Sequence, residues 1–144
     1  MSSNPRYAMV PPVMTVEVED PMDIMIVRDT ARRTAGLVGF NPAHRAQISS
    51  ASATLAELVL KTGDAHTLRM SGIVHNNRRG IQVALTTPWL AGVSANNILV
   101  ALRSKLGDLV DEIMLDDNDP KSPTILMVMW LSAERGKPST EAGQ

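Results

Sequence analysis

The sequence contains no cysteine, only 3% aromatic residues, no excess of either charge and no long apolar run. The lack of cysteine excludes disulfide bonds, thiolate metal sites and cysteine nucleophiles. The 14 Lys and Arg residues nearly balance the 15 Asp and Glu residues, so no overall positive charge would attract nucleic acid. No apolar run approaches the ~20 residues that cross a bilayer, and no apolar core typical of a signal peptide follows the first residues. We therefore expect a cytoplasmic protein without nucleic-acid or membrane partners.

The hydrophobic content is sufficient for one core. Hydrophobic residues make up 44% of the 144 residues, which suits a single domain. Because aromatic residues are few, the core has to be aliphatic and to use several of the nine methionines. Composition predicts a flexible N-terminus over residues 1–9, one domain over residues 10–131 and a polar, disordered tail over residues 132–144.

The first half of the chain is predicted to form one strand and two helices. Apolar and polar residues alternate over residues 14–19, which predicts a half-buried strand. A capping residue followed by proline stands at 20–21 and again at 41–42, and each pair predicts the start of a helix. Gly39 and Gly63 are the expected ends of these two helices.

The second half is predicted to form a hairpin, a helix and a final strand. Residues 66–74 and 80–87 alternate on either side of a polar turn, which predicts a hairpin. Residues 100–115 carry leucine and isoleucine at helical spacing, which predicts a third helix. Residues 124–131 are apolar on both faces, as in a central, covered strand. The predicted fold is an α/β (α+β) two-layer sandwich, a mixed, mostly antiparallel sheet with helices on one face.

No residue pattern by itself predicts an active site. The three histidines lack the spacing of a metal pair on one helix or strand. The acidic residues within 111–119 lack the ordered spacing and the glycine of a calcium loop. Glu57 precedes Lys61 by four residues, which on a helix favours an ion pair on an outer face.

The first predicted helix has side chains that could serve either stability or binding. Arg28, Arg32 and Arg33 lie off its apolar stripe and form either a solvated face paired with Asp29 or a partner-binding patch. Core packing is the favoured use, and partner binding the alternative, for four methionines: Met22, Met25, Met127 and Met129.

Three stretches, taken together, resemble one known family. The first is DIMIVRDTARRTAGLVGF, residues 23–40, with its Asp-Ile start, its arginines and its Gly-Phe end. The second is ISSASATLAELVLKTG, residues 48–63, and the third is DLVDEI followed by PTILMVMWL. In this order they resemble the first helix, the nucleotide-and-magnesium helix, and the last helix with the closing strand of the RsbT-type anti-sigma-factor serine kinases. The resemblance covers residues 13–131 and implies a GHKL (Bergerat) ATPase-like fold.

The resemblance also implies a degenerate nucleotide pocket. The second helix of similar kinases reads Ser-Glu-Leu-x-x-Asn, and here Thr54 and Leu58 stand at the Glu and Asn positions. A threonine is no carboxylate base, and a leucine cannot ligate magnesium. Thr86 or Thr87 stands where similar kinases have the adenine-binding Asp. The glycines that let the backbone of similar kinases lie close to the nucleotide and its phosphates are absent here, apart from one glycine further along the chain. Thr124 is the one polar pocket position that is kept, so we expect no catalytic residue, no metal and no confident cofactor site.

These observations predict a non-catalytic bacterial regulator, a pseudokinase-like relative of the anti-sigma kinases that acts by protein–protein binding and does not bind ATP-Mg normally. The resemblance implies a protein partner such as a STAS-type antagonist, a sigma factor or an enzyme complex, and leaves a homodimer open. One alternative is an active ATP-binding anti-sigma serine/threonine kinase that uses ATP and magnesium. Another is a structural or assembly subunit of a larger complex.

Overall fold

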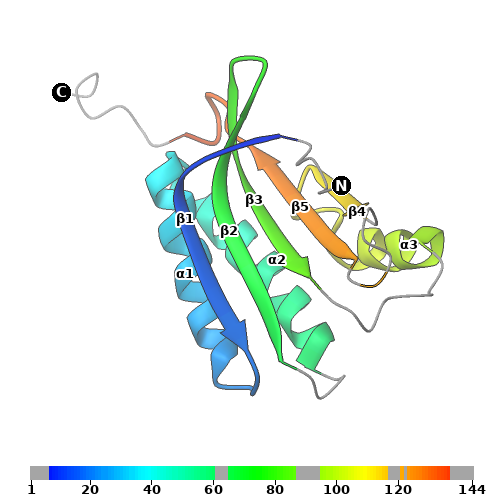
Figure 1. Cartoon of the computed structure of the whole chain (residues 1–144). Coiled ribbons are helices and arrows are strands. Elements are labelled where there is room, and N and C mark those ends of the chain that lie inside the picture. Colours follow the sequence, from blue (N-terminus) through cyan, green and yellow to red (C-terminus); the bar gives the residue numbers. More distant parts are fainter. Residues whose placement is uncertain (1–6, 61–64, 87–94, 117–120, 122, 137–144) are drawn as a thin grey trace.

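The computed structural model describes residues 7–60, 65–86, 95–116, 121 and 123–136 (Figure 1). Their elements follow one another as β1 (Ala8–Val18), α1 (Asp23–Val38), α2 (Pro42–Leu60), β2 (His66–His75), β3 (Arg78–Thr86), α3 (Ala95–Leu106), β4 (Glu112–Asp116) and β5 (Thr124–Trp130). The order expected from the sequence is confirmed, with β4 as an additional strand.

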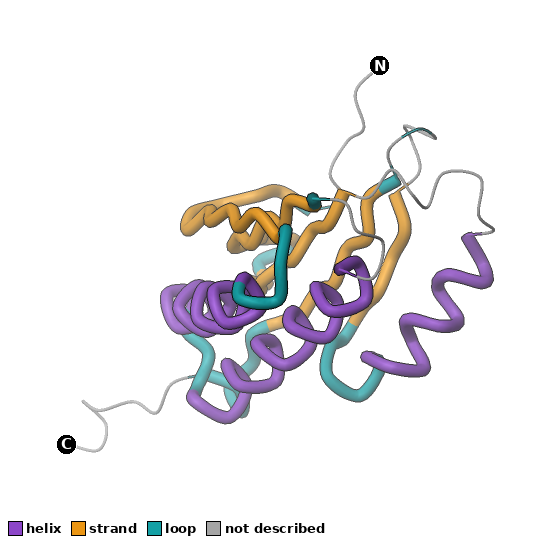
Figure 2. Tube along the Cα trace, turned by 90° about the horizontal axis from the view of Figure 1, so that it is seen from below, coloured by secondary structure: helices purple, strands orange, loops and turns teal. Residues whose placement is uncertain are grey.

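The five strands form one sheet in the order β1-β2-β3-β5-β4. The helices α1 and α2 lie next to each other against one face of this sheet (Figures 1 and 2), so the two-layer α+β arrangement is confirmed. The expectation of a mixed sheet is wrong for the described strands, because every neighbouring pair is antiparallel. β5 lies between β3 and β4 and is buried along nearly its whole length, as expected for a central strand.

The main core fills the space between the helices and this face of the sheet. α1 contributes its predicted stripe, including Val27, Ala31 and Ala35, and α2 contributes Ile48 and Leu55, all of them buried. Burial of apolar surface, at about 25 cal/mol per Å², is the main favourable contribution to folding here. Within the described residues, no helix is long and apolar enough to cross a membrane.

Local signals set the ends of the two long helices. Gly39 follows α1 with a φ of 125°, a conformation that a side chain would strain. The Asn41 carboxamide oxygen accepts a hydrogen bond from the His44 N–H at 2.9 Å, which confirms Asn41 as the cap of α2. α1 begins at Asp23, two residues later than its cap and proline predict, because the Asp20 carboxylate accepts the Met22 N–H in a turn that precedes the helix.

The hairpin and the edge strand also follow from local chemistry. Asn76 and Asn77 have φ values of 52° and 66° and form the two-residue turn between β2 and β3. Asparagine tolerates this left-handed conformation better than most residues. Pro11 and Pro12 lie on the edge strand β1, where the pairing register with β2 shifts around them. An edge strand tolerates the missing amide donors of proline.

The helix predicted over residues 100–115 is wrong in its second half. α3 ends at Leu106, and Glu112–Asp116 forms β4, which pairs with β5. The DLVDEI stretch, expected in the last helix, therefore crosses from a turn into a strand. Helical spacing of apolar residues over 109–113 does not predict this strand, because its stabilisation comes from pairing with partners 8 to 16 residues later in the chain.

The described part of the chain includes residues on both sides of the expected domain of residues 10–131. β1 already includes residues 8 and 9, and Tyr7 before it makes side-chain contacts with the sheet. At the other end, the Asn41 N–H donates to the Arg135 carbonyl oxygen at 2.7 Å, and Gly136 forms a bridge with Phe40. The rest of the expected tail, residues 137–144, lies outside the described residues.

Candidate functional site

The solvent side of α1 and the residue before it carry most of the large apolar side chains that are exposed in the described part of the chain. Met22, Met25, Ile26 and Leu37 have exposed fractions of 80%, 70%, 51% and 58%. They are four of the seven large hydrophobic side chains that are exposed in the described part of the chain. Met22, Met25 and Ile26 stand within one helical turn of each other, and a cluster of exposed apolar side chains is typical of protein-binding sites. We call these four residues, together with Asp29, Arg32 and Arg33, the α1 face.

The four methionines singled out from the sequence divide into two pairs. Met127 and Met129 on β5 are buried, so core packing is confirmed for them. The same expectation is wrong for Met22 and Met25, because α1 buries the opposite side of the helix and leaves both methionines in solvent. A flexible thioether side chain adapts to different partner surfaces, so exposed methionines suit a binding face.

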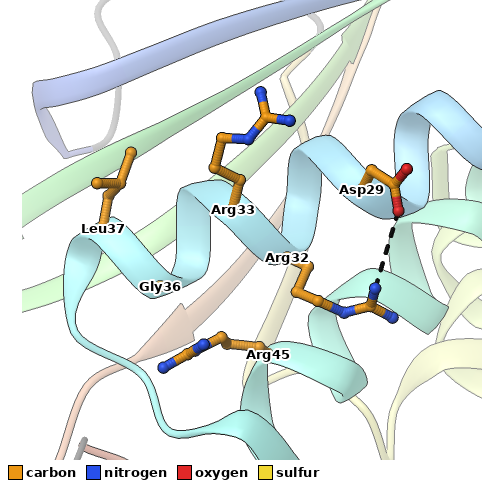
Figure 3. Close-up of a pocket in the computed structure, with 6 residues that line it drawn as sticks. All are labelled: Asp29, Arg32, Arg33, Gly36, Leu37 and Arg45. Carbon is orange, nitrogen blue, oxygen red and sulfur yellow. Dashed lines mark ion pairs between the residues drawn. The ribbon is translucent and has the colours of Figure 1, made fainter.

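A shallow hollow of about 420 Å³ lies on the solvent side of α1 (Figure 3), lined by Asp29, Arg32, Arg33, Gly36, Leu37 and Arg45. Gly36 leaves the surface of the helix low at this point because it has no side chain. A Cβ atom at Gly36 would lie 3.4 Å from Nε of Arg45, which reaches across from α2. That Nε donates a hydrogen bond to the Phe40 carbonyl oxygen at 2.8 Å and so fixes Arg45 beside the end of α1.

The hollow carries a positive charge. Three guanidinium groups line it against one carboxylate, that of Asp29. The Asp29 carboxylate lies 3.8 Å from Arg32, and both side chains are more than half exposed, so this pair contributes little to stability. Arg33 and Leu37 lie on one side of Gly36 and Arg45 on the other (Figure 3). The α1 face therefore offers cationic groups next to apolar ones.

The positions expected in a nucleotide pocket do not form one site. Thr86 ends β3 and Thr124 starts β5, and their hydroxyl oxygens lie 3.2 Å apart. Their neighbours Leu85 and Ile125 belong to the core beneath the helices, and side chains alternate along a strand. Thr86 and Thr124 therefore point to the face of the sheet that α1 and α2 do not cover. Thr87 lies outside the described residues.

The two helical positions, Thr54 and Leu58, lie on the other side of the sheet. Both are half-buried on α2, and Leu58 packs against the main core. The sheet thus separates them from Thr86 and Thr124. Glu57 is exposed on α2, as expected for an outer-face residue, while Lys61 lies outside the described residues. Among the described residues, no three His, Asp or Glu side chains stand close enough to hold a metal ion.

A second cluster, which no sequence pattern indicates, ties Tyr7, the residue before β1, to β4 and β5. The Glu112 carboxylate accepts hydrogen bonds from the Tyr7 hydroxyl and from the Trp130 ring N–H, both at 2.6 Å. The Tyr7 ring meets the Trp130 ring edge-to-face at 4.9 Å. The Arg78 guanidinium lies 4.1 Å from the centre of the Trp130 ring, a cation–π contact. Tyr7 and Glu112 are 105 positions apart, so only the fold brings them together.

Asp111 and Arg135 form a two-bond ion pair beside this cluster. The Arg135 guanidinium donates to both Asp111 oxygens, at 2.5 and 2.9 Å, and the Trp130 backbone N–H donates to the same carboxylate at 2.7 Å. Burial of the carboxyl acts to raise the pKa of Asp111. The hydrogen bonds from Arg135 and Trp130, and the positive charges of Arg135 and Arg78, outweigh burial and hold the pKa below its ordinary value. This pair therefore strengthens the attachment of residues 132–136.

The comparisons with known proteins add no family to this description. No protein-family model matches the chain, and no curated protein matches it either.

Proposed function

We propose that this chain is a non-catalytic regulatory protein of the anti-sigma-factor kinase type, with a GHKL ATPase-like fold, that acts in the cytoplasm by binding another protein. The observation that carries the proposal is the α1 face, where the exposed Met22, Met25 and Ile26 share the helix with a cationic hollow that Leu37 lines. Interfaces are enriched in methionine and arginine relative to other surfaces. Partners of the proposed kind are a STAS-type antagonist, a sigma factor or an enzyme complex.

The chemistry of the expected nucleotide positions supports a binding role over phosphoryl transfer. Leu58 offers no oxygen to a magnesium ion, and Thr54 offers no carboxylate to a hydroxyl nucleophile. Thr86 and Thr124 contribute hydroxyl groups, but these bond to each other across the sheet from α2. A pocket for ATP-Mg would need Thr86 and Thr124 to lie on the same side of the sheet as the α2 positions Thr54 and Leu58.

Isothermal titration with ATP and magnesium tests the non-catalytic part of the proposal. We expect no binding heat at nucleotide concentrations up to the millimolar range. Micromolar affinity would contradict the proposal and favour an active kinase. A titration with magnesium alone serves as the control for heat of dilution and for weak metal binding.

Partner capture tests the binding part. The full chain, tagged at its C-terminus, is used to capture proteins from the native host, in parallel with two variants. Arg32→Gln combined with Arg33→Gln removes two charges from the α1 face and should lose the captured partner. Arg69→Gln removes a charge from an exposed residue of β2 that lies on the other face of the sheet, and should retain it. Equal capture by all three chains would contradict the assignment of the α1 face.

A further inference from the structure

The solvent side of α1 carries positive charge that the described part of the chain does not balance. Arg32 lies 3.8 Å from Asp29, and both side chains are more than half exposed. Arg33 and Arg45 line the same hollow and form no ion pair with any carboxylate of the described residues. The hollow therefore keeps a net positive potential that favours an anionic group from outside the chain.

One of these guanidinium groups, that of Arg45, is held in place by its own chain. Its Nε donates a hydrogen bond to the Phe40 carbonyl oxygen at 2.8 Å, and its Cζ would lie 3.5 Å from a Cβ atom at Gly36. Its two terminal nitrogens make no hydrogen bond to the described residues. Their planar fork matches the two oxygens of a carboxylate. Because the Arg45 side chain is already ordered, binding of an acidic group to it costs little additional side-chain entropy.

Exposed apolar side chains stand on both sides of these charges along the helix. Met25 and Ile26 lie toward the start of α1 and Leu37 lies at its end, with Arg32 and Arg33 between them. Twelve residues separate Met25 from Leu37, which corresponds to about 18 Å along the helix. An inorganic anion is too small to cover this length. An elongated segment of a partner covers it if carboxylates lie in its middle and apolar side chains lie toward both of its ends.

Hydrogen bonding favours a helix over an extended strand as this segment. The backbone groups in the middle of α1 are bonded within the helix, so a strand laid on α1 would find no backbone partners there. A helix satisfies its own backbone groups and binds a surface through its side chains alone. A second copy of this chain matches poorly, because its own α1 face would bring arginines against arginines.

We propose that the α1 face binds an acidic amphipathic helix of a different protein. Its carboxylates lie over the hollow, between Arg33 on one side of Gly36 and Arg45 on the other (Figure 3), and its apolar side chains cover Ile26 and Leu37. The inference rests on the proposed function in one respect, namely that the α1 face is a protein-binding surface, and it adds the chemistry of the element that binds there.

Fluorescence anisotropy with synthetic peptides tests this chemistry on the full chain. The probe is a labelled helical peptide of about 18 residues that carries leucines near both ends and glutamates between them on one side, with alanine and glutamine elsewhere. We expect a Kd of about 10–100 µM, in the range of weak interfaces. A peptide with glutamine in place of glutamate and one with serine in place of leucine are the controls, and each should bind at least about tenfold more weakly.

Variants of the chain locate the peptide on the α1 face. Arg32→Glu combined with Arg33→Glu should weaken binding of the acidic peptide at least about tenfold and should instead bind a peptide with lysine in place of glutamate. Arg45→Lys keeps the charge but removes the fork, and should weaken binding by about threefold to tenfold. Arg69→Gln, on the other face of the sheet, is the matched control and should leave the Kd unchanged. All variants are checked for the circular dichroism spectrum of the parent chain.

Three outcomes would overturn the acidic helix: no binding of the acidic peptide at about 1 mM chain, equal binding of the glutamate and glutamine peptides, or full displacement of the peptide by about 10 mM inorganic phosphate at matched ionic strength, which would indicate a phosphate site. None of them affects the proposed function if partner capture still depends on Arg32 and Arg33. Conversely, micromolar ATP binding by a chain that also binds the acidic peptide would contradict the proposed function and leave the helix-binding site in place.

Discussion

Replacing Glu112 by alanine is expected to lower the free energy of unfolding by about 2–4 kcal/mol, because two hydrogen bonds to a charged acceptor are lost. The carboxylate accepts from Tyr7 and from Trp130, each at 2.6 Å. Each such bond contributes roughly 1.5–3 kcal/mol. Trp130 is only 6% exposed, so its ring N–H would lose its acceptor without gaining water. Tyr7 is half-buried and would recover part of its loss from solvent, so the total lies below the sum of two full contributions.

The assay is urea unfolding followed by circular dichroism, with wild type, Glu112→Ala, Glu112→Gln and Tyr7→Phe compared in one buffer. Glutamine keeps an oxygen for the Trp130 N–H and can donate to the Tyr7 hydroxyl, so it should cost only about 1 kcal/mol. Glu57→Ala, on the exposed side of α2, is the control and should change stability by less than about 0.5 kcal/mol. A Glu112→Ala chain as stable as the control variant would refute this account of the cluster.

Three further measurements follow from the same contacts. Phe40→Ala removes a fully buried ring and should lower the free energy of unfolding by about 3–5 kcal/mol in urea titration; a loss under about 1 kcal/mol would contradict its place in the core. Asp111→Asn should destabilise the chain by about 1 kcal/mol at pH 7, since the hydrogen-bonded ion pair with Arg135 is lost. Because the folded pKa of Asp111 is below its ordinary value, the wild-type advantage is present above about pH 4 and disappears as the pH falls through the folded pKa, and an advantage that grows on acidification would contradict the sign. Asn77→Val should cost about 1–2 kcal/mol in thermal unfolding, because a β-branched residue is strained at a φ of 66°; Asn77→Gly, which is not strained there, should cost nothing and serves as its control.

The hairpin, the first two helices and the central strand could be predicted because their signals are local. Asn41 with Pro42, Gly39 and the Asn76–Asn77 turn each fix a boundary through a hydrogen bond or a backbone angle within a few residues. Apolar spacing on α1 predicted its buried stripe for the same reason. Boundaries were less well determined at the start of α1, where a turn that also has a capping aspartate precedes the helix.

β4 and the Tyr7–Glu112–Trp130 cluster could not be predicted, because both depend on contacts between distant residues. Leu109 and Ile113 keep a helical spacing, and only pairing with β5 makes Glu112–Asp116 a strand. The separation of Thr86 and Thr124 from Thr54 and Leu58 likewise depends on which face of a strand meets the helices.

The sequence by itself determined the number of layers, the order of most elements and the absence of thiol chemistry, since composition and short-range spacing suffice for these. Only the tertiary structure decided which side of α1 is buried against the sheet and which side remains in solvent. Its apolar residues occur all round the helix, and the packing of one stripe on the sheet is what leaves Met22, Met25, Ile26 and Leu37 in solvent beside three arginines. A helix has one side to bury against a sheet, and which residues remain for a partner is settled by that contact.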